Sequence, residues 1–212
     1  QLCKYSADAE KFLKSADNAL AQVNVLLRHQ TAANHSATHL LHSALRETLG
    51  NHIAQKGSLV APNQLRFDFS HFSKVTDEEL KAIEIRVNEK IREDIALQEL
   101  RNVPIAEATK MGATALFGDK YGEFVRVIIF DPAYSMELCG GTHVKRTGEI
   151  GWFKLVSESS VAAGVRRIEA LTGDGAQKFV DQKLETVDQI SEILNNPKDL
   201  TKAIQAIKKK KD

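Results

Sequence analysis

The run from Leu26 to Leu49, which contains neither proline nor glycine, is the feature that most constrains how this chain can fold. Its apolar residues recur at helical spacing, and Gly50 follows directly, as glycine often does after the last turn of a helix. The pattern therefore predicts one long helix. His35 and His39 are four residues apart in it, so their side chains project from the same face.

Two histidines so placed can bind one metal ion, although such a pair is also common on ordinary protein surfaces. The other group of suitable residues is Cys139-Gly-Gly-Thr-His143, far downstream. Thiolate and imidazole are usual zinc ligands, and paired glycines let the backbone turn sharply enough for Cys139 and His143 to face one ion. A lone cysteine is often only a small buried hydrophobe, but the two groups together predict a zinc site. Its ligands would be His35, His39, Cys139 and His143.

The residues around these ligands exclude one class of zinc enzyme. The HExxH motif of metalloproteases needs a glutamate directly after the first histidine to act as a base, and Ser36 occupies that position. Glu137, two residues before Cys139, is a candidate to accept a hydrogen bond from a ligand, as metal-bound histidines usually require. His42 falls near the same helix face as His35, but its more ordinary interpretation is a packed or solvent-facing histidine.

The composition is that of an ordinary globular protein. With 212 residues, 42% of them apolar and 27% charged, the chain can form one good core, or one domain with an appendage. No apolar run approaches the roughly 18 residues of a membrane span, and no signal peptide is apparent. Two cysteines make no disulfide framework in a chain this long, so we expect a reducing, cytoplasmic setting. Since the chain begins at Gln1 and not at Met, we also expect it to be part of a longer protein.

The net charge of +1 gives no sign that the whole molecule binds nucleic acid. Any RNA binding must come from local basic patches. The candidates are Arg166-Arg167, Lys145-Arg146 and the tail Lys208–Lys211, of which the tail is more simply a solvated segment.

Apolar periodicity and turn residues predict the other elements. A strand–turn–strand hairpin covers His52–Val60 and Leu65–Phe69. Thr76 begins an amphipathic helix that runs to about Asp94, with Glu79 completing a capping box. Further strands are expected at Ala19–Val25, Leu97–Asn102, Phe124–Phe130, Gly148–Ser157 and Gly164–Leu171, with a short one just before Cys139. Further helices are expected from Pro104 to the residue before Gly112, over Phe179–Leu194 and, after Pro197, over the stretch that contains Ile204 and Ile207.

These elements predict an α+β fold in which two long helices cover a mainly antiparallel sheet, followed by a C-terminal helical appendage. Residues 1–25 are a poorly specified lead-in, residues 26–173 the main domain, and residues 174–212 the appendage. The appendage is too small to bury a core of its own. We expect it to lead to a further C-terminal domain, to dock on one or to pair with another copy.

Five motifs stand in a distinctive order. They are His-Ser-Ala-Thr-His at 35–39, Arg-Phe-Asp-Phe-Ser-His at 66–71, Ala-Leu-Phe-Gly-Asp-Lys-Tyr-Gly at 115–122, Glu-Leu-Cys-Gly-Gly-Thr-His at 137–143 and Ala-Ala-Gly-Val-Arg-Arg-Ile-Glu at 162–169. In this order and spacing they closely resemble the editing domain of alanyl-tRNA synthetases, from about Leu26 to Gly173. Freestanding editing proteins of the same superfamily share the metal motifs, but the last motif and the helices after it look more like the synthetase.

The resemblance implies hydrolysis of the ester that joins a wrong amino acid, serine or glycine, to the tRNA for alanine. A pocket built for alanine rejects glycine and serine poorly, so a second, hydrolytic site must remove the errors. By the same resemblance, Zn²⁺ is held by the four ligands named above. Gln55 matches a pocket position and Thr38 lies beside the ligands, and both would help to read the serine side chain. The domain that activates alanine with ATP is not visible in these residues, so no aminoacylation is expected from this chain alone.

Two mechanisms stay open. Either zinc activates a bound water, which requires one loose ligand with His143 as the candidate, or zinc holds the substrate while an unbound water attacks. His71 and Asp68 are candidate general bases or merely structural polar residues. The single-stranded end of the tRNA would be contacted through its phosphates. The expected contacts are Arg166, Arg167, Lys145 and Lys120.

Two other classes of function compete with editing. One is a zinc-stabilised RNA-binding module without catalysis, and the other is an assembly segment whose terminal helices pair with another copy or a later domain. The apolar stripe from Phe179 to Leu194 favours some such contact. Neither class accounts for the histidine and cysteine motifs as well as editing does.

Overall fold

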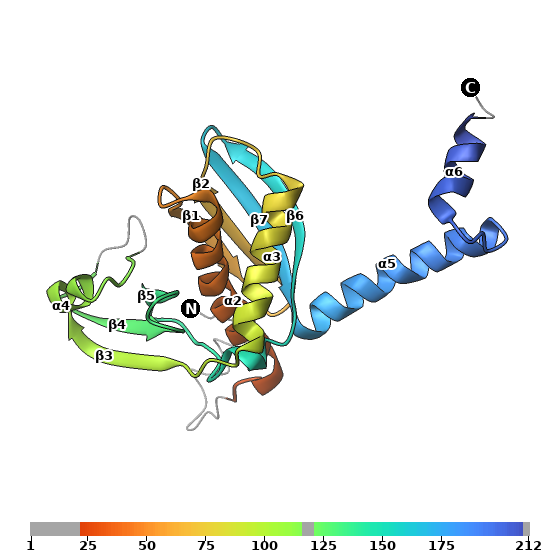
Figure 1. Ribbon diagram of the computed structural model, residues 1–212. Coiled ribbons are helices and arrows are strands. Elements are labelled where there is room, and N and C mark those ends of the chain that lie inside the picture. The colour runs from red at the N-terminus through yellow and green to blue at the C-terminus, as the bar shows by residue number, and fades with distance from the viewer. Residues whose placement is uncertain (1–21, 116–120, 210–212) are drawn as a thin grey trace, which may run out of the picture.

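The computed structural model describes residues 22–115 and 121–209, and it has the α+β architecture that the sequence predicts. Its main layer is a four-stranded antiparallel sheet, which two long helices cover (Figure 1). The helices are α2 (Val25–Leu49) and α3 (Asp77–Arg92). In order across the sheet, the strands are β1 (Gln55–Val60), β2 (Leu65–Ser70), β7 (Val165–Thr172) and β6 (Phe153–Ala162).

The main core lies between this sheet and α2. Alternation along β2 turns one set of side chains inward, and Leu65, Phe67 and Phe69 are fully buried. Leu40 and Leu41 of α2, also fully buried, pack in the same cluster. The predicted long helix and the hairpin are therefore confirmed, although the first strand of the hairpin begins at Gln55 and not at His52 as expected.

Helix α3 begins as predicted, with a capping box. The Thr76 hydroxyl accepts a hydrogen bond from the Glu79 backbone N–H at 3.2 Å, and the Glu79 carboxylate accepts one from the Thr76 N–H at 2.8 Å. Its apolar stripe, Ile83, Val87 and Ile91, is buried. Helix α3 packs on α2 and on β6, and α2 packs on β1, β2 and β7, so the two helices lie side by side on the sheet.

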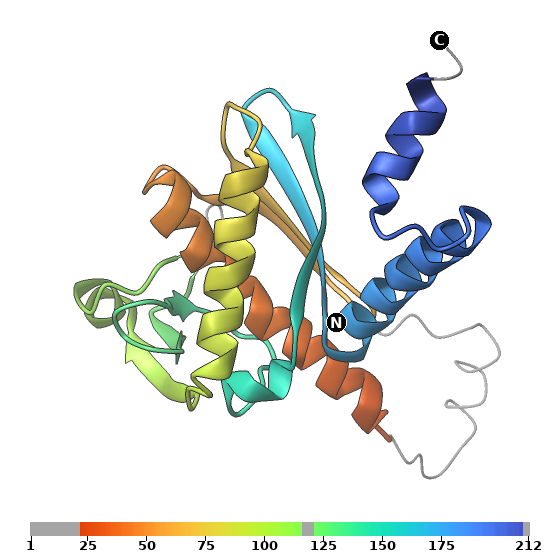
Figure 2. The same cartoon turned by 45° about the vertical axis from the view of Figure 1, so that its right-hand side comes forward.

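A separate three-stranded antiparallel sheet stands beside the helix pair (Figure 2). Its central strand faces two ways, because Val125, Val127 and Ile129 form a small core with Ala108 whereas Ile128 packs in the main core. In order, its strands are β3 (Gln98–Pro104), β4 (Phe124–Ile129) and β5 (Met136–Leu138), and the small core lies under α4 (Ile105–Lys110). The strands are antiparallel as predicted, but they divide into two sheets.

The chain ends in two helices that reach away from the sheets. Helix α5 (Gly173–Ile193) starts directly after β7 and projects outward, and α6 (Leu200–Lys209) lies beyond its far end (Figures 1 and 2). Most of α5 is exposed, and only Ala176 of it is buried. Within the part of the chain that is described, no helix is long and apolar enough to span a membrane.

Two expected strands differ from the structure. The strand predicted from Gly148 begins only at Phe153, because the Thr147 hydroxyl bonds the end of α3 and the chain forms a short 3₁₀ helix, η1 (Thr147–Ile150), instead. The strand predicted over Ala19–Val25 is wrong where it can be judged. Residues 22–24 form no strand, and Asn24 caps α2 by accepting a hydrogen bond from the Leu27 N–H at 3.0 Å. Residues 19–21 lie outside the described range.

Candidate metal centre

Helix α2 carries a row of histidines into the interior. His35 is half-buried, whereas His39 and His42 are 4% and 3% exposed. Helical spacing places the first two side chains one above the other, next to the short strand β5 and the loop that follows it. The row is thus fixed on a rigid, well-packed element and not on a flexible loop.

The loop after β5 brings Cys139 and His143 to this row. Arg126 of β4 secures the loop, because its guanidinium donates hydrogen bonds to the backbone carbonyls of Cys139, at 3.2 Å, and of Gly141. A side-chain carbon at Gly141 would overlap the His35 ring. The glycine therefore permits the close approach of the loop to the helix, a role beyond the sharp turn that the sequence led us to expect.

The four predicted ligands meet at one point. One donor atom from each lies within 4.8 Å of all the others, and the Cys139 sulfur is 3.4 Å from Nε2 of His35. Nε2 of His39 and of His143 are buried without a hydrogen-bond partner among the described residues. Buried polar atoms are rarely left unpaired, and three imidazoles with one thiolate match the donors that zinc prefers. The group could therefore hold a metal ion.

A buried carboxylate orients two of the histidines. Glu137 accepts a hydrogen bond from Nδ1 of His39 at 2.6 Å and another from Nδ1 of His42 at 3.1 Å. With its Nδ1 proton so engaged, His39 presents Nε2 to the other ligands, which is the usual arrangement around a metal-bound histidine. The hydrogen bond predicted for Glu137 is present, and it comes from two histidines at once.

The charged side chains of this group shift one another's pKa values. Burial disfavours the charged form of His39, but the Glu137 carboxylate and Cys139 outweigh it and raise the His39 pKa to about 10. Burial likewise disfavours the thiolate, yet the neighbouring imidazoles of His143, His35 and His39 lower the pKa of Cys139 to about 3. Metal binding would release a proton from His39, because a ligating imidazole must be neutral at the bonding nitrogen.

Ser36 supports the ligand on the loop. Its hydroxyl accepts a hydrogen bond from the Val144 N–H at 3.1 Å and lies 3.3 Å from Nδ1 of His143. If Nε2 of His143 bonds a metal ion, Nδ1 carries the proton and donates to Ser36. The position where metalloproteases place a catalytic base thus holds a ligand in place.

The other polar candidates lie outside this group. Among the contacts described, His42 is linked to it through Glu137 alone, and its ring packs against Phe67 with centroids 5.4 Å apart. Asp68 accepts two hydrogen bonds from Arg167, at 2.7 and 2.8 Å, which hold the pKa of its carboxyl below the usual range. His71 pairs with His52, Nδ1 to Nε2, at 2.9 Å. Asp68 and His71 are thus engaged in structural contacts, and their role as bases stays a prediction.

The two expected pocket residues differ in setting. Thr38 is buried on α2, where its hydroxyl donates to the Asn34 carbonyl at 2.8 Å. Gln55 begins β1, and its amide donates to the Ser58 hydroxyl at 3.3 Å. No contact of either residue with the metal group appears among the described residues, so their part in reading a substrate stays a prediction.

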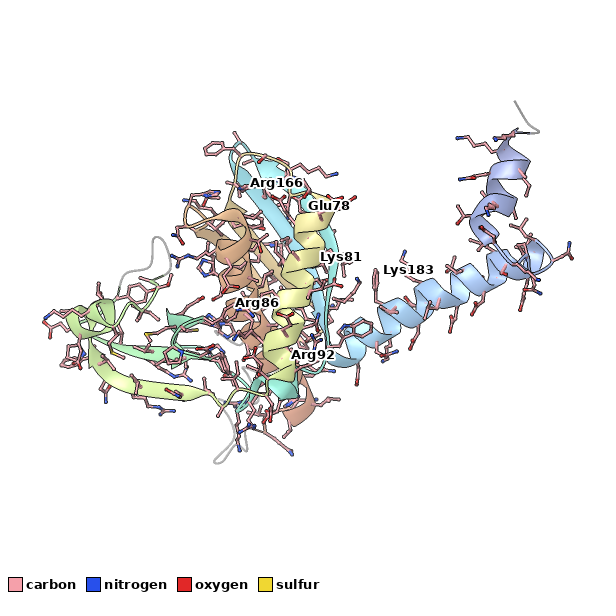
Figure 3. The ribbon with its side chains drawn as sticks, viewed as in Figure 1. Glu78, Lys81, Arg86, Arg92, Arg166 and Lys183 are labelled. Atoms are coloured by element: carbon pink, nitrogen blue, oxygen red, sulfur yellow. The ribbon has the colours of Figure 1, made fainter. Side chains whose placement is uncertain are left out.

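The expected tRNA contacts are divided between two places. Arg166 and Arg167 lie on β7, with Arg166 near its beginning (Figure 3), and the guanidinium of Arg166 pairs with Glu158 at 2.5 and 2.7 Å. Lys145 is exposed just after the metal loop, in the wall of the same cleft as His143. Lys120 lies outside the described residues.

Sequence reasoning missed the residues that support the ligands from a distance along the chain. Arg126 read only as one residue of a buried strand, and Ser36 only as the residue that breaks the protease motif. The alternation of β4 was a usable signal, since it sets Arg126 on the same face as Ile128, which packs in the main core. Nothing local predicted that this face would meet the loop.

The comparisons with known proteins show what this chain is similar to. Residues 125–169 match the family described as threonyl and alanyl tRNA synthetase second additional domain. The alanine–tRNA ligase of Cytophaga hutchinsonii is 65% identical over 184 residues, which cover 87% of this chain. The chain is a homologue of part of alanine–tRNA ligase. The ligase of Porphyromonas gingivalis is 54% identical over 90% of the chain, and that of Salinibacter ruber is 59% identical over 79%.

The chain corresponds to a limited part of those proteins. The matched region spans 21%, 22% and 17% of the three relatives in the order given. Both candidate ligands on the loop, Cys139 and His143, fall inside the matched family region together with Arg126, whereas the histidines of α2 precede it. The family match and the metal group therefore overlap at the loop.

Proposed function

We propose that this chain binds one Zn²⁺ and hydrolyses the ester of tRNA(Ala) charged in error with serine or glycine. The observation that carries the proposal is the convergence of His35, His39, Cys139 and His143, whose donor atoms lie within 4.8 Å of one another. Homology to alanine–tRNA ligases supports an RNA substrate that carries an amino acid. The editing unit would comprise residues 26–173, and residues 174–212 a helical segment attached to it.

The roles of the residues follow from their contacts. Zn²⁺, when bound, would supply a Lewis acid that polarises an oxygen or fixes a polar group of the substrate. Glu137 keeps His39 in the tautomer that presents Nε2, and Ser36 does the same for His143. Arg126 holds the loop carbonyls, so Cys139 keeps its place when substrate enters. These contacts fix the ligands in advance, and little ordering remains to be done on binding.

Gln55 and Thr38 are the proposed readers of the serine side chain. The Gln55 amide lies at the open end of the hairpin, where it bonds only the Ser58 hydroxyl among the contacts described. A Gln55→Ala variant that clears serine as fast as the unaltered chain, while Thr38→Val also has no effect, would remove both from this role.

The decisive experiment follows the release of labelled serine from serine-charged tRNA(Ala). We expect fast release by the chain, and loss of release in Cys139→Ala because the set of ligands is broken. Gly140→Ala is the matched control in the same loop, since an added side-chain carbon there meets nothing within 4 Å. Release that is equally fast in Cys139→Ala would refute a metal-dependent deacylase.

One observation favours a second candidate, a zinc-stabilised RNA-binding module without catalysis. Four protein ligands leave no open position on a tetrahedral ion, which is typical of structural zinc sites. This module would bind the tRNA end and release no serine. Removal of the metal separates the two, because an editing enzyme loses hydrolysis in proportion to the metal lost, whereas the module loses only its fold and its RNA affinity.

The C-terminal helices are a proposed contact for another copy or another domain. Leu184, Val187, Ile190 and Ile193 are 38–79% exposed along α5, as are Ile204 and Ile207 of α6 at 46% and 54%. Sedimentation of the chain as a monomer at high concentration would argue against self-association through them.

A further inference from the structure

A cavity of about 280 Å³ opens along α2, beyond the row of histidines. Ser43 and Arg46 lie in its wall, and they follow His39 by one and two helical turns, so the three side chains project from one face of α2. The wall also contains Thr114 and Glu137. None of the four candidate metal ligands lines this cavity, which is therefore distinct from the candidate metal centre.

The Ser43 hydroxyl is a buried polar group that is left without a partner. Ser43 is 8% exposed, and its side chain makes no hydrogen bond with any residue that the structure describes. A serine or threonine inside a helix often bonds the carbonyl four residues earlier, as Thr38 does with Asn34 on the same helix. Because buried hydroxyls are rarely left unpaired, the Ser43 hydroxyl is available to a molecule in the cavity.

Arg46 supplies positive charge to the cavity from a fixed position. Its Nη1 donates a hydrogen bond to the Thr114 hydroxyl at 3.0 Å. Backbone hydrogen bonds with Met136 and Leu138, both 2.9 Å long, hold Thr114 beside β5. A guanidinium has five N–H donors in a planar fork, so most of the donors of Arg46 remain for a ligand.

The carboxylates in the cavity wall are already engaged. Glu47 accepts hydrogen bonds from Nε and Nη2 of Arg86, at 2.8 and 3.3 Å. The oxygens of Glu137 accept hydrogen bonds from His39 and His42. Arg46, in contrast, forms no ion pair within the described part of the chain. An anion that enters the cavity therefore meets a cation that has no counter-charge among these residues.

The free donors of the cavity match a carboxylate. Two parallel N–H groups of an arginine bond both oxygens of a carboxylate, which is the geometry that a planar fork favours. Ser43 and Arg46 are three residues apart on α2, so their side chains are neighbours and can reach the same anion. The volume is just below the range typical of sites for drug-sized molecules, so the ligand is small. Pro132 and Met136 offer apolar surface to its carbon atoms.

We propose that this cavity binds a small molecule through its carboxylate, with Arg46 bonding both oxygens and the Ser43 hydroxyl donating to one of them. The inference goes beyond the proposed function and does not depend on it, because it uses neither the metal ligands nor RNA. Two kinds of molecule share this chemistry, a free amino acid and a carboxylic acid that has no ammonium group.

The test follows the amide NMR signals of the 212-residue chain while acetate replaces chloride at constant ionic strength. We expect saturable shifts at Gly112 and Ala133 in the cavity wall. Arg46→Gln weakens acetate binding about tenfold or more, because a hydrogen bond to a charged group is worth about one to two tenfold steps in affinity. Arg46→Lys keeps the charge but loses the fork, and it also weakens binding. The control, Arg92→Gln at an exposed position on α3 outside the cavity (Figure 3), leaves the affinity unchanged.

The Ser43→Ala variant separates binding from folding. Alanine is a better helix former than serine, and the hydroxyl that is removed has no described partner, so the free energy of unfolding in denaturant does not fall. Acetate binding nevertheless weakens about threefold or more, because one hydrogen bond to the ligand is lost. Acetate affinity that is unchanged in Ser43→Ala and in Arg46→Gln overturns the inference.

Further titrations identify the kind of molecule and exclude the metal group as the binding place. Tighter binding of glycine than of acetate assigns the cavity to free amino acids, and the reverse assigns it to acids without an ammonium group; either result supports the inference. Methylammonium, which has no carboxylate, does not bind, and binding equal to that of acetate overturns the inference. Folded Cys139→Ala binds acetate as the unaltered chain does. Loss of acetate binding in this variant would place the anion on the metal group and would also overturn the inference.

Discussion

Replacement of Glu137 by glutamine tests how the histidine row is held, because it exchanges one oxygen for an amide nitrogen at almost constant size. Each carboxylate oxygen now accepts one hydrogen bond, from Nδ1 of His39 and from Nδ1 of His42. A glutamine offers one acceptor oxygen and one NH₂ donor, so one of the two imidazoles meets a donor instead of an acceptor. Since Nε2 of His42 is buried without a described partner, moving the His42 proton there leaves it unbonded.

The expected loss of zinc affinity in Glu137→Gln can be estimated from other metal sites. Removal of the partner of a metal-bound histidine typically weakens metal binding about 10- to 100-fold, which is about 1.4–2.7 kcal/mol. The Glu137 side chain is only 4% exposed, so water cannot replace the missing acceptor. We therefore expect a loss of zinc affinity near the upper end, close to a hundredfold.

The assay is a competition titration in which a coloured chelator and the protein share Zn²⁺ at pH 7. Glu107→Gln is the matched control, because Glu107 is exposed on α4 and makes no described side-chain contact with the metal group. Circular dichroism verifies that both variants are folded. Equal zinc affinity in Glu137→Gln and Glu107→Gln would refute the idea that Glu137 holds the ligands in place.

Two further predictions concern the metal loop and the sheet. Gly141→Ala abolishes zinc binding, measured by metal analysis after dialysis, because the added carbon would overlap the His35 ring; retention of one zinc per chain would contradict the loop geometry. Asp68→Asn lowers the free energy of unfolding at pH 7 by about 1–3 kcal/mol, since the carboxylate accepts two hydrogen bonds from Arg167. The Asp68 pKa is lowered in the folded state, so this stabilisation is present above the unfolded pKa of about 3.9 and is lost as the pH falls through the folded pKa. Denaturant unfolding at pH 7 and at pH 2 measures the difference between the two chains, and a difference that does not shrink at low pH would show that the pair is not its source.

Much of the fold was readable from the sequence because its signals are local. The long helix α2, the hairpin and the capping box of α3 depend on residues close together in the chain, and each was found. The separation into two sheets depends on the pairing of β2 with β7, strands more than ninety residues apart. No local pattern encodes that pairing, so a single sheet was the natural expectation.

In the candidate site too, residues with a local sequence pattern could be predicted and contacts between distant segments could not. Its four candidate ligands could be proposed because each half has a recognisable spacing, His35 to His39 on a helix and Cys139 to His143 around two glycines, and the structure brings the four together. The supporting contacts of Ser36 and Arg126 join segments that the sequence keeps apart, so only the folded chain reveals them. Glu137 was predicted from its position beside the loop, but its second partner was not.

The most direct measurement of a zinc-dependent deacylase is a titration of the metal-free chain with Zn²⁺ while serine release from serine-charged tRNA(Ala) is followed. We predict no release at the start, a rise in proportion to the zinc added, and a plateau at one zinc per chain. Serine release by the metal-free chain, or no release after one zinc is bound, would contradict the assignment.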